Sequence, residues 1–202
     1  MKQLTLIALF VVLVVGMLPA QGIVGVGPKL GLNFATAGGD NSSYFSTTTK
    51  FFFGGFLDYN VVQNFDLQGE LLYNTTGAKF PIGGSTYDVG ISYLEIVALA
   101  DYNVPLEHGA KIFFLAGPQL GFKLSANAHN ETTGGDADVS SKYAGADFDI
   151  VFGVGASFKA GPGSIVVDVR YCFGLANVNT SNPPSNTNQV ISLGVGYAFR
   201  VM

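Results

Sequence analysis

The sequence predicts an all-β fold, an eight-stranded antiparallel up-and-down transmembrane β-barrel. Three observations predict it. Apolar and polar residues alternate with a period of two along eight segments, which is typical of strands with two different faces. The connections between these segments are alternately short and long. The composition is 48% hydrophobic but only 12% charged, and the 27 glycines and 17 phenylalanines are spread over many short runs.

Residues 1–22 have the features of a secretory signal peptide. Lys2 gives a positively charged start, an apolar run extends to Leu18, and a small-x-small cleavage pattern follows. The apolar run is too short for a spanning helix, which needs about 18–20 residues. We therefore expect the chain to be exported, with residues 23–202 forming the barrel domain.

Eight strands are predicted in order along this domain. In the first, Leu30 and Phe34 share one face, whereas Lys29 and Asn33 share the other. The same division into an apolar and a more polar face recurs in the other seven segments. The predicted strands cover residues 25–35, 50–61, 65–75, 91–104, 111–124, 147–159, 167–175 and 191–200.

The connections differ in length on the two sides of the predicted barrel. Short ones follow the second, fourth and sixth strands, with the sequences VVQN, PLEHG and AGPG. Long polar ones follow the other strands, with the sequences TAGGDNSSYFSTT, TGAKFPIGGST, SANAHNETTGGDADVSSKYAG and NTSNPPSNTNQ. Transmembrane barrels have this asymmetry, with the long loops outside the cell. The even number of strands then brings both ends of the barrel to the periplasmic side.

The apolar faces are predicted to contact lipid. They are too large and too aromatic to fill an eight-stranded barrel, and the opposite faces are rich in glycine and serine. A soluble barrel would have the reverse arrangement, with the apolar face inside. Two aromatic girdles are expected, one near the short turns and one near the long loops. Their members are Tyr59, Phe65, Tyr102 and Phe158, and Phe34, Tyr73, Phe122 and Phe148.

Charged residues of both signs occur on the predicted inner faces. Buried charges are tolerated when they are paired and hydrogen-bonded, and eight strands leave no room for a wide channel. We therefore interpret them as a structural ion network rather than a selective ion path. The predicted members are Lys29, Glu70, Glu95, Lys111, Lys123, Asp149, Asp168, Arg170 and Arg200.

Asp168 and Arg170 lie in the apolar stretch SIVVDVRYCFGLANV and share one face of the seventh strand. If AGPG closes a hairpin with the sixth strand, Gly155 and Gly153 lie opposite these two residues and leave space for them. The two side chains would then lean inward to partners such as Asp149 or Arg200.

The sequence offers little for catalysis. A hydrolase or acyltransferase of the Ser-His-acid type needs a histidine beside a nucleophile, and the chain has only His108 and His129. His129 could approach Ser125 or Asp136, but a flexible surface histidine is the favoured interpretation. The stretch GGDAD lacks a full calcium-loop pattern, so no metal or other cofactor is predicted. The net charge is −4 without a basic cluster, which argues against a nucleic-acid partner.

Several stretches resemble the outer-membrane β-barrel domain family often labelled "porin family protein", which includes small eight-stranded barrels. They are GPKLGLNFAT, LQGELLYNTTGAKF, SYLEIVALADYNV, FFLAGPQLGFKLSA and VISLGVGYAF. The resemblance covers nearly the whole mature chain. It implies an eight-stranded barrel in the cell outer membrane and brings no catalytic signature with it.

The expected function is that of a small integral outer-membrane protein without enzymatic activity. It would have a structural role or act through its long extracellular loops. A narrow passive channel for ions or small solutes is the alternative, and a lipid-modifying enzyme is the third hypothesis. The expected partners are outer-membrane lipid, the outer-membrane assembly machinery and an unidentified extracellular ligand or surface partner.

Overall fold

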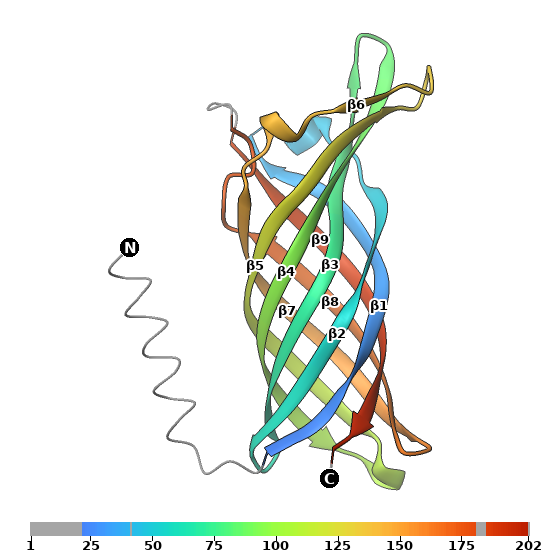
Figure 1. The fold of residues 1–202 in the computed structure, drawn as a ribbon, viewed down its shortest axis with the longest axis vertical. Helices are drawn as coiled ribbons and strands as arrows, with labels where there is room; N and C mark the ends of the chain where they lie inside the picture. Colours follow the sequence, from blue (N-terminus) through green and yellow to red (C-terminus); the bar gives the residue numbers. More distant parts are fainter. Residues whose placement is uncertain (1–21, 41, 181–184, 202) are drawn as a thin grey trace, which may run out of the picture.

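Eight long antiparallel strands form a closed barrel in the computed structural model, which describes residues 22–40, 42–180 and 185–201 (Figure 1). The order around the ring is β4-β3-β2-β1-β9-β8-β7-β5, and β5 pairs with β4 to close it. The strands are β1 (Gly22–Gly39), β2 (Thr48–Val62), β3 (Phe65–Ile82), β4 (Ser85–Pro105), β5 (Lys111–Asn130), β7 (Ala146–Ala160), β8 (Gly163–Gly174) and β9 (Asn186–Arg200). The predicted fold class is confirmed. The predicted leader lies outside the described residues, apart from Gly22.

The short turns lie at one end of the barrel, together with the start of β1 and the end of β9 (Figure 1). The turn after β7 contains Gly161, and the turn after β2 contains Asn64, which has a positive φ of 65°. Asparagine and glycine adopt this left-handed conformation more easily than other residues do. The turn after β4 contains a short 3₁₀ helix, η2 (Glu107–Gly109). The first strand therefore begins, and the last strand ends, on the side of the short turns, as the sequence predicts.

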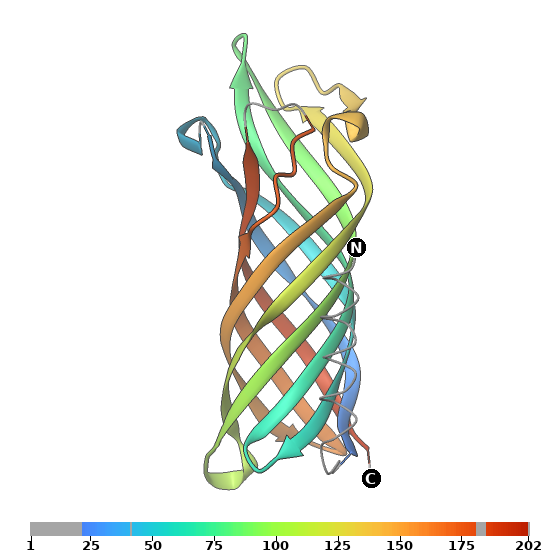
Figure 2. The same cartoon turned by 90° about the vertical axis from the view of Figure 1, so that its left-hand side faces the viewer.

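One predicted long loop is instead a continuation of the sheet. The stretch TGAKFPIGGST was expected to be a long polar loop, but β3 and β4 stay paired until Ile82 faces Ser85 across Gly83 and Gly84. Both glycines have positive φ, as a tight hairpin turn requires. This hairpin rises above the rest of the barrel (Figure 2). In the sequence, Lys79, Pro81 and the glycines made the alternation of the two strands difficult to recognise in this stretch.

The loop after β5 contains two short elements, β6 (Asp136–Asp138) and the 3₁₀ helix η3 (Ser140–Lys142). β6 pairs with the end of β5, where Asn127 faces Asp138. A further 3₁₀ helix, η1 (Ser42–Tyr44), lies in the connection between β1 and β2. The nine-stranded sheet therefore consists of an eight-stranded barrel and one short added strand.

The outer surface of the barrel is apolar on every long strand. Side chains at alternate positions are about half exposed, for example Leu30 at 58%, Phe53 at 52% and Phe152 at 54%. A soluble protein rarely exposes so many large apolar side chains in one continuous band. The alternation of exposed and buried residues follows the predicted faces, and it supports lipid as the surrounding medium.

The interior is more apolar than the sequence predicts. Twelve buried apolar residues form one cluster beside the buried charges. Phe52 lies against Gly31, where a Cβ atom would be 2.5 Å from the ring, and Phe113 lies against Gly155, where it would be 2.2 Å away. Inward aromatic rings therefore occupy the space that glycines leave on neighbouring strands. The other cluster members are Ala35, Phe56, Leu72, Val97, Leu99, Leu115, Val151, Val166, Cys172 and Val190.

Candidate functional site: the charged interior of the barrel

Four charged side chains form a closed network inside the barrel. Glu70 on β3 accepts hydrogen bonds from both cations: Lys29 Nζ lies 3.1 Å from its Oε1, and Arg170 Nη1 lies 2.6 Å from its Oε2. Asp168 on β8 forms ion pairs with the same two cations, with Lys29 Nζ at 2.6 Å from Oδ2 and Arg170 Nε at 2.8 Å from Oδ1. Two positive and two negative charges therefore neutralise one another. We call these four residues the ion network.

The ion network crosses the lumen. β3 and β8 are four places apart in the ring of eight strands, so Glu70 and Arg170 come from opposite walls. The four side chains are only 0–5% exposed. Gln68 extends the network, because its Oε1 accepts a hydrogen bond from Arg170 Nη2 at 3.2 Å. The ion network and Gln68 therefore form a layer across the barrel interior at the depth of these residues.

Glycines make room for the ion network, but not in the predicted way. Gly153 and Gly155 do pair with Arg170 and Asp168. Only Gly153 provides space, since its added Cβ would lie 3.0 Å from Arg170 Cγ, whereas Gly155 faces an aromatic ring. Gly194 on β9 has the larger role, because a Cβ there would lie 2.8 Å from Lys29 Cε and 2.9 Å from Asp168 Oδ1.

The predicted partners of Asp168 and Arg170 were wrong. Their charges are matched by Lys29 and Glu70, not by Asp149 or Arg200. Asp149 on β7 accepts a hydrogen bond from Gln119 Nε2 at 3.0 Å. Arg200 is exposed and makes no ion pair with any described residue. The distance between two inward residues along the sequence does not tell whether they meet across the lumen of a closed barrel.

A second polar layer lies between the ion network and the long loops, and amides dominate it. Ser192 Oγ donates to Asn33 Oδ1 at 2.7 Å, Asn33 Nδ2 donates to Asn74 Oδ1, and Asn74 Nδ2 donates to Glu95 Oε2 at 2.8 Å. Glu95 is therefore buried within hydrogen-bonding distance of an amide rather than a cation. The amides Gln68, Asn74 and Gln119 were not among the predicted network members. Their signal was available, because they occupy inward positions of their strands.

The remaining predicted network members lie near the two ends of the barrel. Lys123 on β5 donates to the carbonyl oxygens of Ser140, at 2.5 Å, and Tyr143, so it anchors the loop after β5. Lys111 lies near the short turns, with Nζ 3.5 Å from Asp66 Oδ2. The structure therefore brings together only four of the nine predicted residues as one ion network.

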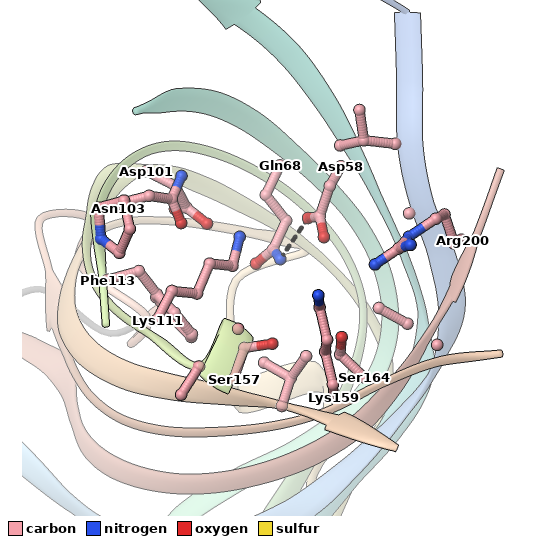
Figure 3. Close-up of a pocket in the computed structure, with 18 of the residues that line it drawn as sticks. Asp58, Gln68, Asp101, Asn103, Lys111, Phe113, Ser157, Lys159, Ser164 and Arg200 are labelled. Atoms are coloured by element: carbon pink, nitrogen blue, oxygen red, sulfur yellow. Dashed lines mark hydrogen bonds between the residues drawn. The ribbon is translucent and has the colours of Figure 1, made fainter. Parts of the chain in front are cut away.

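A cavity of about 340 Å³, lined by both polar and apolar side chains, opens at the short-turn end (Figure 3). We call it the periplasmic vestibule, because the short turns are the side that the sequence predicts to face the periplasm. Lys111, Lys159 and Arg200 point into it, and Asp58 and Asp101 lie on its other side. Gln68 forms part of its wall and donates to Asp58 Oδ1 at 2.7 Å, so the vestibule borders the ion network.

The long loops pack on one another at the opposite end. Ser46 exchanges backbone hydrogen bonds with Lys79 of the β3–β4 hairpin, at 2.8 and 3.0 Å. Ala144 N donates to Val178 O at 2.8 Å. Asp138 accepts a hydrogen bond from the backbone N–H of Ser140, which lowers the pKa of the Asp138 carboxyl below its usual value. These loops enclose a largely apolar cavity of about 670 Å³ between the hairpin and the loops after β1, β5 and β8.

His129 and Asp136, which the sequence offers as candidates for catalysis, lie on the surface. His129 Nδ1 is 2.8 Å from Asp136 Oδ1, and the two side chains are 51% and 77% exposed. The structure gives this pair no hydrogen bond to Ser125. Among the described residues, no cluster of three or more His, Cys, Asp or Glu side chains has an arrangement that could hold a metal ion. No described helix is long and apolar enough to cross a membrane.

Comparisons with known proteins give a family and a fold. The model of the family described as "Outer membrane protein beta-barrel domain" matches residues 20–179. No match was found among curated proteins. Neisserial surface protein A (NspA) is 16% identical with a TM-score of 0.52, over 89% of this chain and 100% of that one. The attachment invasion locus protein Ail of Yersinia pestis is 15% identical with a TM-score of 0.45, over 87% and 99%. OprG of Pseudomonas aeruginosa is 10% identical with a TM-score of 0.47, over 90% and 98%.

Proposed function

Because the chain belongs to the outer membrane protein β-barrel domain family, we propose that it is a closed, non-enzymatic barrel that acts through its extracellular surface. One observation carries the proposal: the ion network joins opposite walls of the barrel, with side chains only 0–5% exposed. An ion crossing the lumen would have to displace Arg170 from two carboxylates. Breaking a buried pair of this kind costs about 3–5 kcal/mol.

The extracellular end supports the second half of the proposal. The paired β3–β4 hairpin projects beyond the barrel (Figure 2), and the loops are fastened to it and to one another by backbone hydrogen bonds. Large apolar side chains are exposed there, including Tyr44 at 67% and Ile82 at 59%. An ordered surface with exposed aromatic and aliphatic groups favours binding to another macromolecule. Lipid of the outer membrane and its assembly machinery remain the other proposed partners.

Electrical recording tests the closed state. Purified protein refolded into planar bilayers is expected to give no reproducible conductance steps, while a general porin in the same bilayers serves as the positive control. Correct folding is checked by the faster gel mobility of unboiled samples. Steps that recur in the wild type and change in size with Arg170→Met would contradict the proposal.

The same arginine variant makes a separate prediction about stability. Arg170→Met leaves Glu70 and Asp168 with only Lys29 as a counter-ion, so the free energy of unfolding should fall by about 3–5 kcal/mol. Urea titrations followed by far-UV circular dichroism measure it, since the chain has no tryptophan. Lys142→Met, at an exposed loop residue, is the matched control and should change stability by less than about 0.5 kcal/mol. Equal losses in the two variants would argue against a stabilising ion network.

A narrow channel is the second candidate, because a cavity opens at each end of the barrel, about 340 Å³ at the short turns and 670 Å³ at the long loops. These cavities would be the two vestibules of a path that the ion network interrupts. The recording above decides between the two functions. A lipid-modifying enzyme has less support, since His129 and Asp136 are solvent-exposed and no hydrogen bond joins them to a nucleophile.

A further inference from the structure

The polar groups of the periplasmic vestibule are separated by type around the ring of strands. Hydrogen-bond acceptors come from one side of the ring, the β2-β3-β4 side: Asp58 on β2, and Asp101 and Asn103 on β4. Cations and hydroxyls come from the other side, β5-β7-β8-β9, with Lys159 and Arg200 among them. Figure 3 shows the two sets facing each other across the cavity. The vestibule therefore has an acceptor wall and a cationic wall.

The cationic wall lacks counter-ions. Neither Lys159 nor Arg200 has a carboxylate oxygen within ion-pair distance among the described residues, although their charged ends point toward the centre of the cavity (Figure 3). Two other lysines in the half of the barrel nearer the short turns do have acidic partners, since Lys29 belongs to the ion network and Lys111 contacts Asp66. Ser157 and Ser164 add hydroxyl groups beside the two free cations. This wall suits a carboxylate or phosphate group.

Two oxygens of the acceptor wall lack donors. Asp101 and Asn103 are only 5% and 6% exposed, yet Asp101 Oδ1 and Asn103 Oδ1 have no hydrogen-bond partner. Asn103 Nδ2 already donates to Asp66 Oδ2 at 2.9 Å, which leaves its carbonyl oxygen directed away from that contact. Buried acceptors of this kind are costly unless a donor reaches them. An ammonium group carries a positive charge and three N–H donors, which is enough to supply one donor to each of these oxygens.

We propose that the periplasmic vestibule binds a small zwitterion, whose acidic group contacts Lys159 and Arg200 and whose amine contacts Asp101 and Asn103. A volume of about 340 Å³ suits a ligand of this size. Phe113 and Val166, both buried, line the inner part of the cavity, and the ion network lies beyond Gln68. Ligand therefore enters and leaves from the periplasmic side only. Gly109 keeps the wall open, because a Cβ there would lie 2.5 Å from Lys159 Cε.

Three probes of related chemistry test the two-ended nature of the site: phosphoethanolamine, inorganic phosphate and ethanolamine. Each is titrated into the refolded protein in a non-ionic detergent, so that no detergent headgroup competes, and binding is followed by calorimetry and backbone amide shifts. Phosphoethanolamine should bind at least tenfold more tightly than either half. Phosphate binding as tightly as phosphoethanolamine, or no binding by any probe, would overturn the proposal.

Variants assign the two walls. Arg200→Gln or Lys159→Gln should weaken phosphoethanolamine binding about tenfold, and the isosteric Asp101→Asn should do the same from the amine side. Lys142→Gln, an exposed lysine at the extracellular end, is the matched control and should leave affinity unchanged. Gel mobility of unboiled samples shows that each variant folds. If Asp101→Asn binds like the wild type, the acceptor wall has no role and the proposal fails.

A lipid headgroup and a free solute could both supply this chemistry, and vesicles distinguish them. If phosphatidylethanolamine vesicles shift the Lys159 and Arg200 amide signals relative to phosphatidylcholine vesicles, the source is the lipid. A shift that requires added phosphoethanolamine identifies a soluble ligand, and no shift in either arm would overturn the proposal. These binding results do not depend on whether the lumen is closed, because conductance recording tests the closed lumen separately.

Discussion

At the scale of single residues, Arg170 differs from Lys29 in the number of nitrogens that donate to the same two carboxylates. Its planar guanidinium donates to Glu70 through Nη1 and Nη2, at 2.6 and 2.8 Å, and to Asp168 through Nε, at 2.8 Å. A lysine at this position would place a single ammonium where the arginine presents a rigid fork. Arg170 can therefore bridge carboxylates from opposite walls while Lys29 supplies the second positive charge.

Gly194 is predicted to be essential for this packing. In Gly194→Ala the new methyl group would meet Lys29 Cε at 2.8 Å and Asp168 Oδ1 at 2.9 Å, so the ion network must shift. Overpacking of this type costs about 1–3 kcal/mol. Urea unfolding in vesicles measures it, with Gly69→Ala as the control, because the nearest atom to a Cβ at Gly69 is 3.8 Å away. A Gly194→Ala protein as stable as Gly69→Ala would show that the ion network is not tightly packed.

At the scale of elements, the residues of each barrel strand alternate between the barrel interior and the exposed outer face. On β8, Val166, Asp168 and Arg170 are 4–7% exposed, whereas Val167 and Val169 between them are 38% and 46% exposed. A shift by one residue would place the ion network in lipid and valines in the lumen, which fixes the register strongly. The hairpin of β3 and β4 shows that the same pairing continues beyond the apolar band.

Charge on the outer face of β8 should be costly in a depth-dependent way. Val169→Lys introduces an ammonium at the middle of the exposed apolar positions, and the free energy of unfolding in vesicles should fall by about 2–4 kcal/mol. Ile165→Lys, near the short-turn end of the same face, should lose only about 0–1 kcal/mol. Urea titration of vesicle-bound protein gives both values. Equal losses would indicate that lipid does not surround this face.

At the scale of the whole molecule, closure of the barrel gives each of its eight strands a hydrogen-bonded neighbour on both sides. β1 pairs with both β2 and β9, so the first and last strands leave no free edge. An open edge in the hydrocarbon region would leave backbone N–H and C=O groups without partners, at several kcal/mol each. Closure also brings residues far apart in the sequence, such as Lys29 and Asp168, to the same depth.

A disulfide across the closing seam tests this arrangement. Leu32 on β1 directly faces Leu193 on β9, so the pair Leu32→Cys and Leu193→Cys should oxidise readily in a Cys172→Ser background. Boiled, non-reduced protein would then migrate differently from reduced protein, because a loop of the chain is closed. Leu32→Cys with Val195→Cys, offset by two residues, is the control. Equal cross-linking of the two pairs would contradict the register of the seam.

The sequence alone determined the two faces of the strands, their antiparallel order and the family resemblance. The alternation of Lys29 with Leu30, or Asp168 with Val169, is a local property, and the period of two follows from the backbone of any strand. The resemblance to outer-membrane barrels is confirmed by the family match over residues 20–179.

Only the tertiary structure decided which inward residues meet. Glu70 and Arg170 are brought together by closure across a lumen, Arg200 lies instead at the vestibule, and Gly194 rather than Gly155 gives Asp168 its space. The TGAKFPIGGST stretch likewise proved to be hairpin, because pairing with a neighbouring strand outweighed its turn-like composition. The physical reason is the same in each case: a strand's own sequence fixes which side a residue faces, while its partner is set by ring closure and stagger.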